Sequence, residues 1–470
     1  MLRFNHHTHT LEQAEYQYDL HDVKDANLYR DIYSYGEVPK IAFNQRLVPM
    51  DPPARIFITD TTFRDGQQAR PPYTVKQIVD LFDLIHRLSG PKGIIRQCEF
   101  FLYTDKDREA VEKCRARGYR YPEITGWIRA VKGDFQLVKQ MGLKETGILT
   151  SASDYHIFMK LRKTRKQALE MYLDIARAAL DNGIIPRCHF EDITRADFYG
   201  FVVPFAQELM RLSEKYRMPA KIRACDTLGY GVPYPGASLP RSVPGIIYGL
   251  THYAGVPSDW LEWHGHNDFY KVLINASTAW LHGCGAANGT LLGLGERTGN
   301  TPIESLVMEY IMLRGDADGM DTRVITEIAD YYRKEVCYQV PPMTPFVGSD
   351  FNITRAGIHI DGLLKSEEIY NIFDTKKILN RPISIAITDK SGVAGIAYWV
   401  DMYFGLEGDK RIPKDHPALL KIKAWVDKEY ESGRASAISN EEMLELAKKY
   451  LPEYFAGKAA EEKPSLVSVK

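Results

Sequence analysis

From Arg55 onward, short apolar runs alternate with longer amphipathic stretches. Each apolar run has the length of a single strand, and polar or glycine-containing segments separate it from the next. Eight runs are therefore predicted to be β-strands: residues 55–59, 93–100, 122–128, 145–151, 183–191, 220–226, 260–266 and 288–294.

The segments between these runs have the spacing of amphipathic helices. After Thr74, a good N-cap residue, apolar side chains recur with helical periodicity until Gly90. Residues 165–183, 201–216 and 271–285 repeat the pattern. Eight strands that alternate with helices over about 250 residues predict an α/β fold, a closed (β/α)8 TIM barrel. A doubly wound sheet is disfavoured, because it needs fewer strands and usually a Gly-rich first turn.

The pattern changes on both sides of this region. Residues 1–54 are polar and rich in aromatic side chains, and we expect an N-terminal extension that packs on the larger body. For His6, His7 and His9, a lightly packed terminus is favoured over a metal-binding tract. The remaining boundaries are predicted as follows: barrel 55–315, mostly helical C-terminal subdomain 316–455, and disordered tail 456–470.

Composition limits the partners. The 60 basic and 61 acidic residues give a net charge of -1, so nothing indicates nucleic acid or a membrane surface, and a small-molecule ligand is expected. The six cysteines are scattered without C-x-x-C spacing, as in reduced cytosolic proteins. Neither a signal-peptide core nor an apolar run of membrane-span length is present, so a soluble cytoplasmic protein is expected.

Polar residues at two predicted strand ends suggest a metal site. Catalytic groups of such barrels lie at the C-terminal ends of strands. Arg64 and Asp65 follow the first strand and, taken alone, would be a surface ion pair. His264 and His266 end the seventh strand, two residues apart, so both point to one face. An isolated H-x-H is often incidental, but one carboxylate and two imidazoles converging on a barrel mouth predict a divalent metal.

The fifth predicted strand carries three polar groups on one face. Arg187, His189 and Glu191 alternate with apolar residues, and burying them without partners would be costly. Ligand binding is favoured over a structural ion pair. In the Gly-rich GLGERTGN (293–300), Glu296 and Asn300 are placed to face the same site, although this loop is a weak signal by itself.

Five segments in order, DTTFRDGQQ, FEDITR, DTLG, HGHND and GLGERTGN, resemble the DRE-TIM metallolyase superfamily. This superfamily includes isopropylmalate, homocitrate and citramalate synthases and hydroxymethylglutaryl-CoA lyases. The resemblance runs from about residue 55 to 374. AGIHIDGLLK (356–365) is similar to a segment of the isopropylmalate and homocitrate synthase branch that the lyases lack, so a lyase is disfavoured.

The resemblance implies a metal centre with defined ligands. Asp65, His264 and His266 match the metal ligands of the superfamily, and Asn300 matches a fourth, weaker one. The implied cofactor is a divalent cation, Mn²⁺ in the first place, although Mg²⁺, Co²⁺ or Zn²⁺ would also suit a site of oxygen and nitrogen ligands.

The resemblance also implies roles in substrate binding and catalysis. Arg64 matches the arginine that polarises the ketone, and Glu296, His359 and Tyr370 match the set that handles the methyl proton of acetyl-CoA. His359 and Tyr370 come from the neighbouring subunit in that family, which implies a homodimer with shared active sites. Substrate contacts are expected from five residues: His156, Arg187, His189, Glu191 and Thr227.

As a whole the chain is most similar to the Re-face-specific, citrate-forming family within this branch. That resemblance implies a Claisen condensation of acetyl-CoA with oxaloacetate, followed by thioester hydrolysis to citrate and CoA. His189 stands where isopropylmalate synthases carry a small residue, and extra cationic groups suit a dianionic acceptor. Because 2-oxoglutarate is also a dianion, homocitrate synthase stays open as an alternative, as does 2-isopropylmalate synthase. A metal-binding regulator on a decayed barrel is disfavoured by the complete motif set.

Overall fold

The computed structural model describes residues 2–5, 10–13, 18–406 and 408–455. Two expectations fall outside these ranges: the one for His6, His7 and His9, and the one for the tail. The chain divides into two compact units. The first runs to Val324 and includes Lys334–Val336, and the second comprises Ile325–Arg333 and the chain from Cys337 onward.

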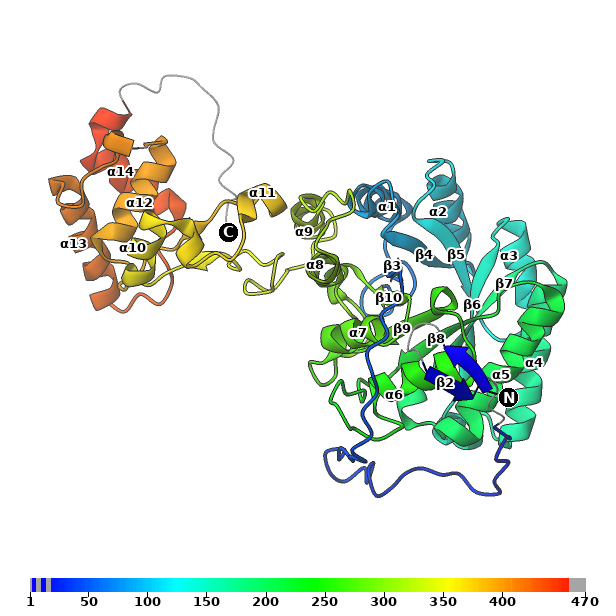
Figure 1. Ribbon diagram of the computed structural model, residues 1–470. Coiled ribbons are helices and arrows are strands. Elements are labelled where there is room, and N and C mark those ends of the chain that lie inside the picture. The colour runs from blue at the N-terminus through cyan, green and yellow to red at the C-terminus, as the bar shows by residue number, and fades with distance from the viewer. Residues whose placement is uncertain (1, 6–9, 14–17, 407, 456–470) are drawn as a thin grey trace. The chain divides into compact units, whose positions relative to one another are not determined.

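Eight parallel strands close into a barrel in the first unit (Figure 1). The strand order is β10-β3-β4-β5-β6-β7-β8-β9, so every strand pairs with its neighbour in sequence and the last pairs with the first. This confirms the predicted (β/α)8 fold. The strands are β3 (Phe57–Asp60), β4 (Ile95–Phe101), β5 (Glu123–Ile128), β6 (Glu145–Ser151), β7 (Ile185–Glu191), β8 (Lys221–Asp226), β9 (Leu261–Gly265) and β10 (Ala286–Gly289).

Helices follow the strands and surround the barrel (Figure 1). The helix predicted after Thr74 is confirmed: Thr74 and Gln77 form a reciprocal capping box, and the stripe that includes Leu81 and Ile85 is buried. The helices are α1 (Val75–Ser89), α2 (Asp105–Arg115), α3 (Phe135–Gln140), α4 (Arg165–Asp181), α5 (Val203–Tyr216), α6 (Val243–Tyr248), α7 (Val272–Leu281) and α8 (Ile303–Arg314).

The eighth strand lies earlier than its apolar pattern predicted. We expected residues 288–294, but β10 ends at Gly289, and Leu292 adopts a left-handed conformation with φ 57°. A side chain at Gly289 would place its Cβ 2.4 Å from the carbonyl oxygen of Thr301, so the two backbones approach closely here. The leucines after Gly289 belong to the turn that begins the Gly-rich loop, and short apolar runs do not distinguish a strand from such a turn.

Hydrogen bonds of backbone and side-chain groups join the N-terminal segment to the barrel. The Asn27 amide donates to Asp154 Oδ2 (2.7 Å), the Tyr33 hydroxyl donates to the Thr194 carbonyl (2.6 Å), and the Asp51 amide donates to the Leu281 carbonyl (2.9 Å). Further upstream, β1 (Leu2–Asn5) and β2 (Thr10–Gln13) pair as antiparallel strands, which the polar sequence did not predict. Asn27 and Tyr33 thus contact the loops that follow β6 and β7, whereas Asp51 contacts the last residue of α7.

The second unit is mostly helical and has its own apolar core, which includes Ile360, Ile396, Leu419 and Met443. Two short strands pair in parallel. The elements are α9 (Val324–Lys334), of which Ile325–Arg333 belong to this unit, β11 (Ile353–Thr354), α10 (Gly357–Lys365), α11 (Thr375–Leu379), β12 (Ser384–Ile385), α12 (Gly392–Phe404), α13 (Pro417–Glu431) and α14 (Asn440–Tyr450).

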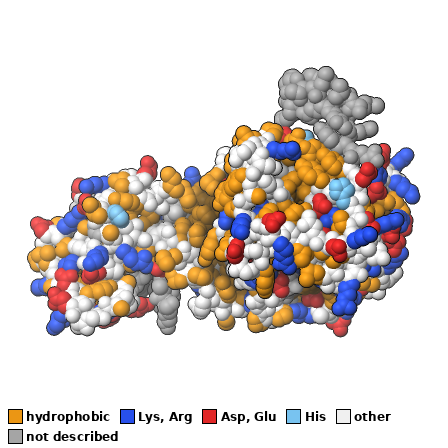
Figure 2. Space-filling model, turned by 90° about the horizontal axis from the view of Figure 1, so that it is seen from below, with side chains coloured by type: hydrophobic (Ala, Val, Ile, Leu, Met, Phe, Trp, Pro, Cys, Tyr) orange, Lys and Arg blue, Asp and Glu red, His pale blue; other side chains and the backbone are white. Residues whose placement is uncertain are grey.

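The surface carries charges of both signs. On the face drawn in Figure 2, acidic and basic side chains are interspersed among the residues that the structure describes. Within the described ranges, none of the helices combines the length and apolarity that a bilayer crossing requires.

Candidate metal centre and acceptor site

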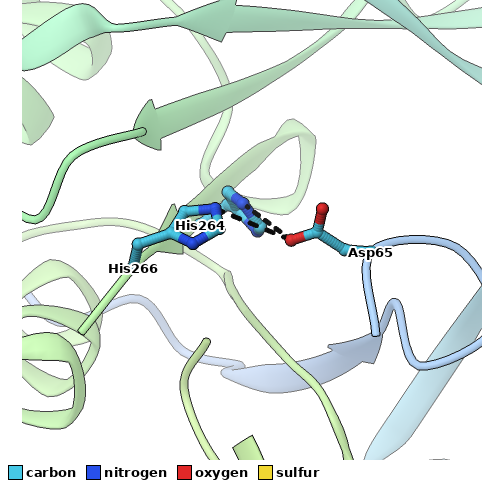
Figure 3. Close-up of side chains that lie close together, drawn as sticks. All are labelled: Asp65, His264 and His266. Carbon is cyan, nitrogen blue, oxygen red and sulfur yellow. Dashed lines mark ion pairs between the residues drawn. The ribbon is translucent and has the colours of Figure 1, made fainter. Parts of the chain in front are cut away.

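Asp65, His264 and His266 converge at the carboxyl end of the barrel strands (Figure 3). Asp65 lies in the loop after β3, His264 lies on β9, and His266 directly follows that strand. One potential ligand atom from each lies within 4.8 Å of the others, and all three side chains are buried. The barrel thus brings together residues that are about 200 positions apart in the chain, as the strand-end argument expected.

Asn300 lies beside this cluster and contacts Asp65. Its Nδ2 donates to Asp65 Oδ2 (2.7 Å), while its buried Oδ1 has no hydrogen-bond partner among the described residues. Gly295 makes room for it, because a Cβ at Gly295 would lie 1.7 Å from that oxygen. An unpartnered buried amide oxygen is costly unless a water or another donor donates a hydrogen bond to it or a cation binds it.

The neighbours of His264 fix its tautomer. Asn288 Nδ2 donates to Thr59 Oγ1 (2.9 Å), so the Oδ1 of Asn288 faces His264 and accepts from its Nδ1 (2.7 Å). The Nε2 of His264 therefore carries the lone pair, and it lies 3.7 Å from Asp65 Oδ2. This arrangement is typical of metal-bound histidines, whose other ring nitrogen donates to a fixed acceptor.

Electrostatics keep the cluster in its ligand form. Burial opposes ionisation of Asp65, but the Arg64 guanidinium and both imidazoles outweigh it and lower the pKa of Asp65 to about 2. Burial and the neighbouring His264 lower the pKa of His266 to about 4, and burial also lowers the pKa of His264. At neutral pH the cluster is one carboxylate with two neutral imidazoles, and its donor set fits a divalent cation.

Arg64 borders the cluster. Its Nη1 donates to Asp65 Oδ1 (2.8 Å), and its guanidinium lies 4.5 Å from the centre of the Trp127 ring. Trp127 was missed in the sequence, because a tryptophan in an apolar strand reads as core. The Thr125 hydroxyl contacts Arg187 in the barrel interior, and Trp127 stands two residues further along the same strand. Period-two alternation therefore places Trp127 on the interior face as well.

Glu191 ends β7 within a compact polar group. It accepts from the Ser151 hydroxyl and lies 3.1 Å from His156 Nδ1. Burial favours its neutral form, but His156, Ser151 and Lys160 outweigh this and lower the pKa of Glu191 to about 2. Thr227, directly after β8, accepts from the Asp192 amide (2.8 Å). His156, Glu191 and Thr227 are thus linked along the ends of β7 and β8.

Arg187 has a different environment from the one expected. It lies in the barrel interior with 2% of its surface exposed, and its Nη atoms donate to Glu99 (2.5 Å) and Glu145 (3.0 Å). Glu262 lies 3.4 Å from its Nε. These carboxylates compensate the guanidinium charge, and a contact of Arg187 with a dianionic acceptor stays a prediction. The structural ion pair, the disfavoured alternative, describes Arg187 better.

His189 lies beside this ion network. Its Nε2 is 3.5 Å from Glu99 Oε1 and has no hydrogen bond among the described residues. Burial and Arg223 outweigh Glu99 and lower the pKa of His189 to about 3, so the imidazole is neutral at pH 7. His189 can therefore offer a hydrogen bond to a ligand without a positive charge, and its contact with the acceptor stays a prediction.

The three residues expected to handle the methyl proton belong to different units. Glu296 lies in the Gly-rich loop of the first unit and is exposed. His359 on α10 and the nearby Tyr370 lie in the second unit, with ring centres 4.6 Å apart. Both rings are exposed to solvent.

The closed barrel and the cluster of one carboxylate and two imidazoles together indicate an enzyme with a metal site. A family model matches the chain over the barrel. The HMGL-like family model covers residues 55–331, so the chain belongs to the HMGL-like family. This confirms the resemblance drawn from the ordered motifs.

Two relatives are identical to this chain at more than half of the aligned positions. Over 453 aligned residues, the chain is 60% identical to citrate (Re)-synthase of Syntrophus aciditrophicus. The alignment covers 96% of this chain and 72% of that protein. It is 58% identical over 443 residues to citrate (Re)-synthase of Clostridium kluyveri, covering 94% and 98%. The 2-phosphinomethylmalate synthase of Streptomyces hygroscopicus is 36% identical over 433 residues, covering 91% and 97%.

Proposed function

We propose that this protein catalyses the condensation of acetyl-CoA with oxaloacetate and the hydrolysis of the thioester, giving citrate and CoA. It is thus an acyltransferase that acts at the citrate-forming step of the tricarboxylic acid cycle. The observation that carries the proposal is the identity of about 60% over nearly the whole chain to citrate (Re)-synthase. The relatives named homocitrate synthase and 2-isopropylmalate synthase, the two alternatives, are more distant from this chain.

Asp65, His264 and His266 would hold a divalent cation, with Asn300 as a weaker ligand. We assign Mn²⁺ to this site. When bound, the cation would supply Lewis-acid polarisation of the acceptor ketone. The donors of Arg64 stabilise the negative charge that develops on the ketone oxygen, and Glu191 and Thr227 orient the 2-oxo acid beside it.

His359, supported by Glu296 and Tyr370, takes a proton from the acetyl-CoA methyl group. The resulting enolate carbon attacks the ketone carbon, and the ketone oxygen gains a proton. Water then adds to the thioester carbonyl, and CoA leaves as the thiol. His189 contributes a hydrogen-bonding group near the acceptor.

The shared site of a homodimer is part of this proposal. The segment that carries His359 and Tyr370 exposes large apolar side chains, including Ile358 (78%) and Ile372 (96%). Apolar side chains grouped around functional residues are typical of an interface, and a second copy of the chain is the partner that we propose. Five buried cysteines remain thiols, which supports a reducing, cytoplasmic location.

The test is CoA release from acetyl-CoA with Mn²⁺, comparing oxaloacetate, 2-oxoglutarate, 2-oxoisovalerate and pyruvate. We expect turnover with oxaloacetate alone and its loss on chelation. Preference for another acid would contradict the assigned acceptor, and turnover that survives chelation would contradict the metal centre.

A further inference from the structure

Two aromatic rings hold the guanidinium of Arg64. Its Cζ lies 4.5 Å from the centre of the Trp127 ring and 5.9 Å from that of Phe101. The two rings meet edge to face, 5.6 Å apart at an angle of 89°. The cation therefore lies against a corner formed by the Phe101 and Trp127 rings, called the aromatic corner below.

The barrel determines where this corner lies. Phe101 is the last residue of β4, and Trp127 is the penultimate residue of β5, so both stand at the carboxyl ends of neighbouring strands. Phe101 is two residues beyond Glu99, whose carboxylate lies in the barrel interior against Arg187. Period-two alternation places Phe101 on that inward face, at the mouth where Asp65 lies.

The aromatic corner contacts Arg64 without accepting hydrogen bonds from its N–H groups. Arg64 donates to Asp65 through Nη1 (2.8 Å), and its buried Nε has no partner among the described residues. Arg187 also has a buried Nε without a hydrogen-bond partner, but its Nη atoms donate to carboxylates and to Gln97. An aromatic face attracts a guanidinium without occupying its N–H groups, so stacking orients Arg64 and leaves donors unused.

Trp127 carries a second unused donor. Its indole Nε1 is buried and has no partner among the residues that the structure describes. Trp263 and Trp280 have the same kind of unpartnered indole N–H, so this donor does not mark a ligand contact, and the indole acts on Arg64 through its face.

We propose that Trp127 is a positioning residue for Arg64: its indole face sets the guanidinium plane so that free N–H groups meet the oxygens of the 2-oxo acid. This rests on the proposed function and adds a residue to it. Trp127 acts through Arg64, so replacing it changes turnover of the acceptor without changing metal binding.

The experiment compares Trp127→Leu and Trp127→Phe in the full-length, Mn²⁺-loaded protein, with Trp260→Leu as the matched control, since Trp260 lies outside the site. We expect kcat/KM for the acceptor to fall about tenfold in Trp127→Leu and about threefold or less in Trp127→Phe, which keeps an aromatic face. Metal content and the thermal midpoint should stay within the range of the control. If Trp127→Leu does not fold, Trp127→Met replaces it.

A double-mutant cycle with Arg64→Lys separates positioning from general packing. Lysine lacks the planar group that stacks, so Trp127→Leu should cost less than twofold in the Arg64→Lys background. Equal losses in both backgrounds would overturn the proposal, as would unchanged kcat/KM in Trp127→Leu.

Every variant is assayed with whichever of the four acceptors the wild type turns over fastest. A preference for an acid other than oxaloacetate would contradict the proposed function while the Trp127 comparison still applies to that acid. A wild-type value for Trp127→Leu on the preferred acid would contradict the role of Trp127 alone.

Discussion

Nδ1 of His264 donates to Oδ1 of Asn288 over 2.7 Å, and this hydrogen bond decides which nitrogen of the imidazole faces Asp65. Asn288 is itself oriented by donation to Thr59 on β3, the neighbouring strand. The presentation of one metal ligand therefore depends on three adjacent strands of the closed barrel.

Asn288→Leu should weaken metal binding. Leucine has a similar volume but cannot accept from His264, so the imidazole loses its fixed tautomer, and we expect affinity for Mn²⁺ to fall about 10- to 100-fold. Titration calorimetry on the metal-free protein measures this. Asn288→Asp, which keeps an acceptor, is the control. Equal affinities in all three proteins would show that the hydrogen bond does not support the metal.

Asp65→Asn and His266→Ala should each lose metal and turnover together, because each removes one of three converging ligand atoms. Metal content after dialysis and CoA release are the two measurements. Asp259→Asn, which breaks only the exposed ion pair with Arg55, should retain both. Full activity in either site variant would refute the metal assignment.

Arg187→Met should destabilise the fold more than it affects the acceptor. Removing the guanidinium takes one cation from a balanced buried network, in which Glu99 keeps Arg223 and Glu145 keeps Lys221, and we expect the free energy of unfolding to fall by about 3 kcal/mol. Denaturant unfolding provides that value, and steady-state kinetics of the folded fraction provide KM. Unchanged stability with a strongly raised KM for oxaloacetate would contradict this expectation and support Arg187 as a substrate contact.

Glu304 should make stability depend on pH. Burial raises the pKa of Glu304 to about 7, above its ordinary value of 4.5, so the folded state holds a proton that the unfolded state releases between these pH values. Stability from this group is complete below pH 4.5 and declines as pH rises through 7, by at most roughly 3 kcal/mol.

Glu304→Gln tests this dependence, since glutamine mimics the protonated acid and can still accept from the Leu292 amide. Its unfolding free energy should match the wild type at pH 4.5 and exceed it at pH 8. Parallel pH profiles for the two proteins would contradict a titrating Glu304.

Much of the fold followed from local pattern. Runs such as 145–151 agree with the observed strand residue for residue, because a buried parallel strand bounded by polar turns has few alternatives. The last strand was misplaced because leucines in a tight turn and leucines in a strand present the same apolar run. The convergence of Asp65, His264 and His266 was predictable from strand-end positions alone.

The sequence by itself determined which residues face the barrel interior, since period two assigns Arg187, His189 and Glu191 to one side of β7 whatever lies opposite. Only the tertiary structure decided what they meet. Closing the sheet brings Glu99 and Glu145 to Arg187, Asn288 to His264 and Trp127 to Arg64. These partners come from other strands. Periodicity within one strand carries no information about which side chains of other strands it meets when the barrel closes.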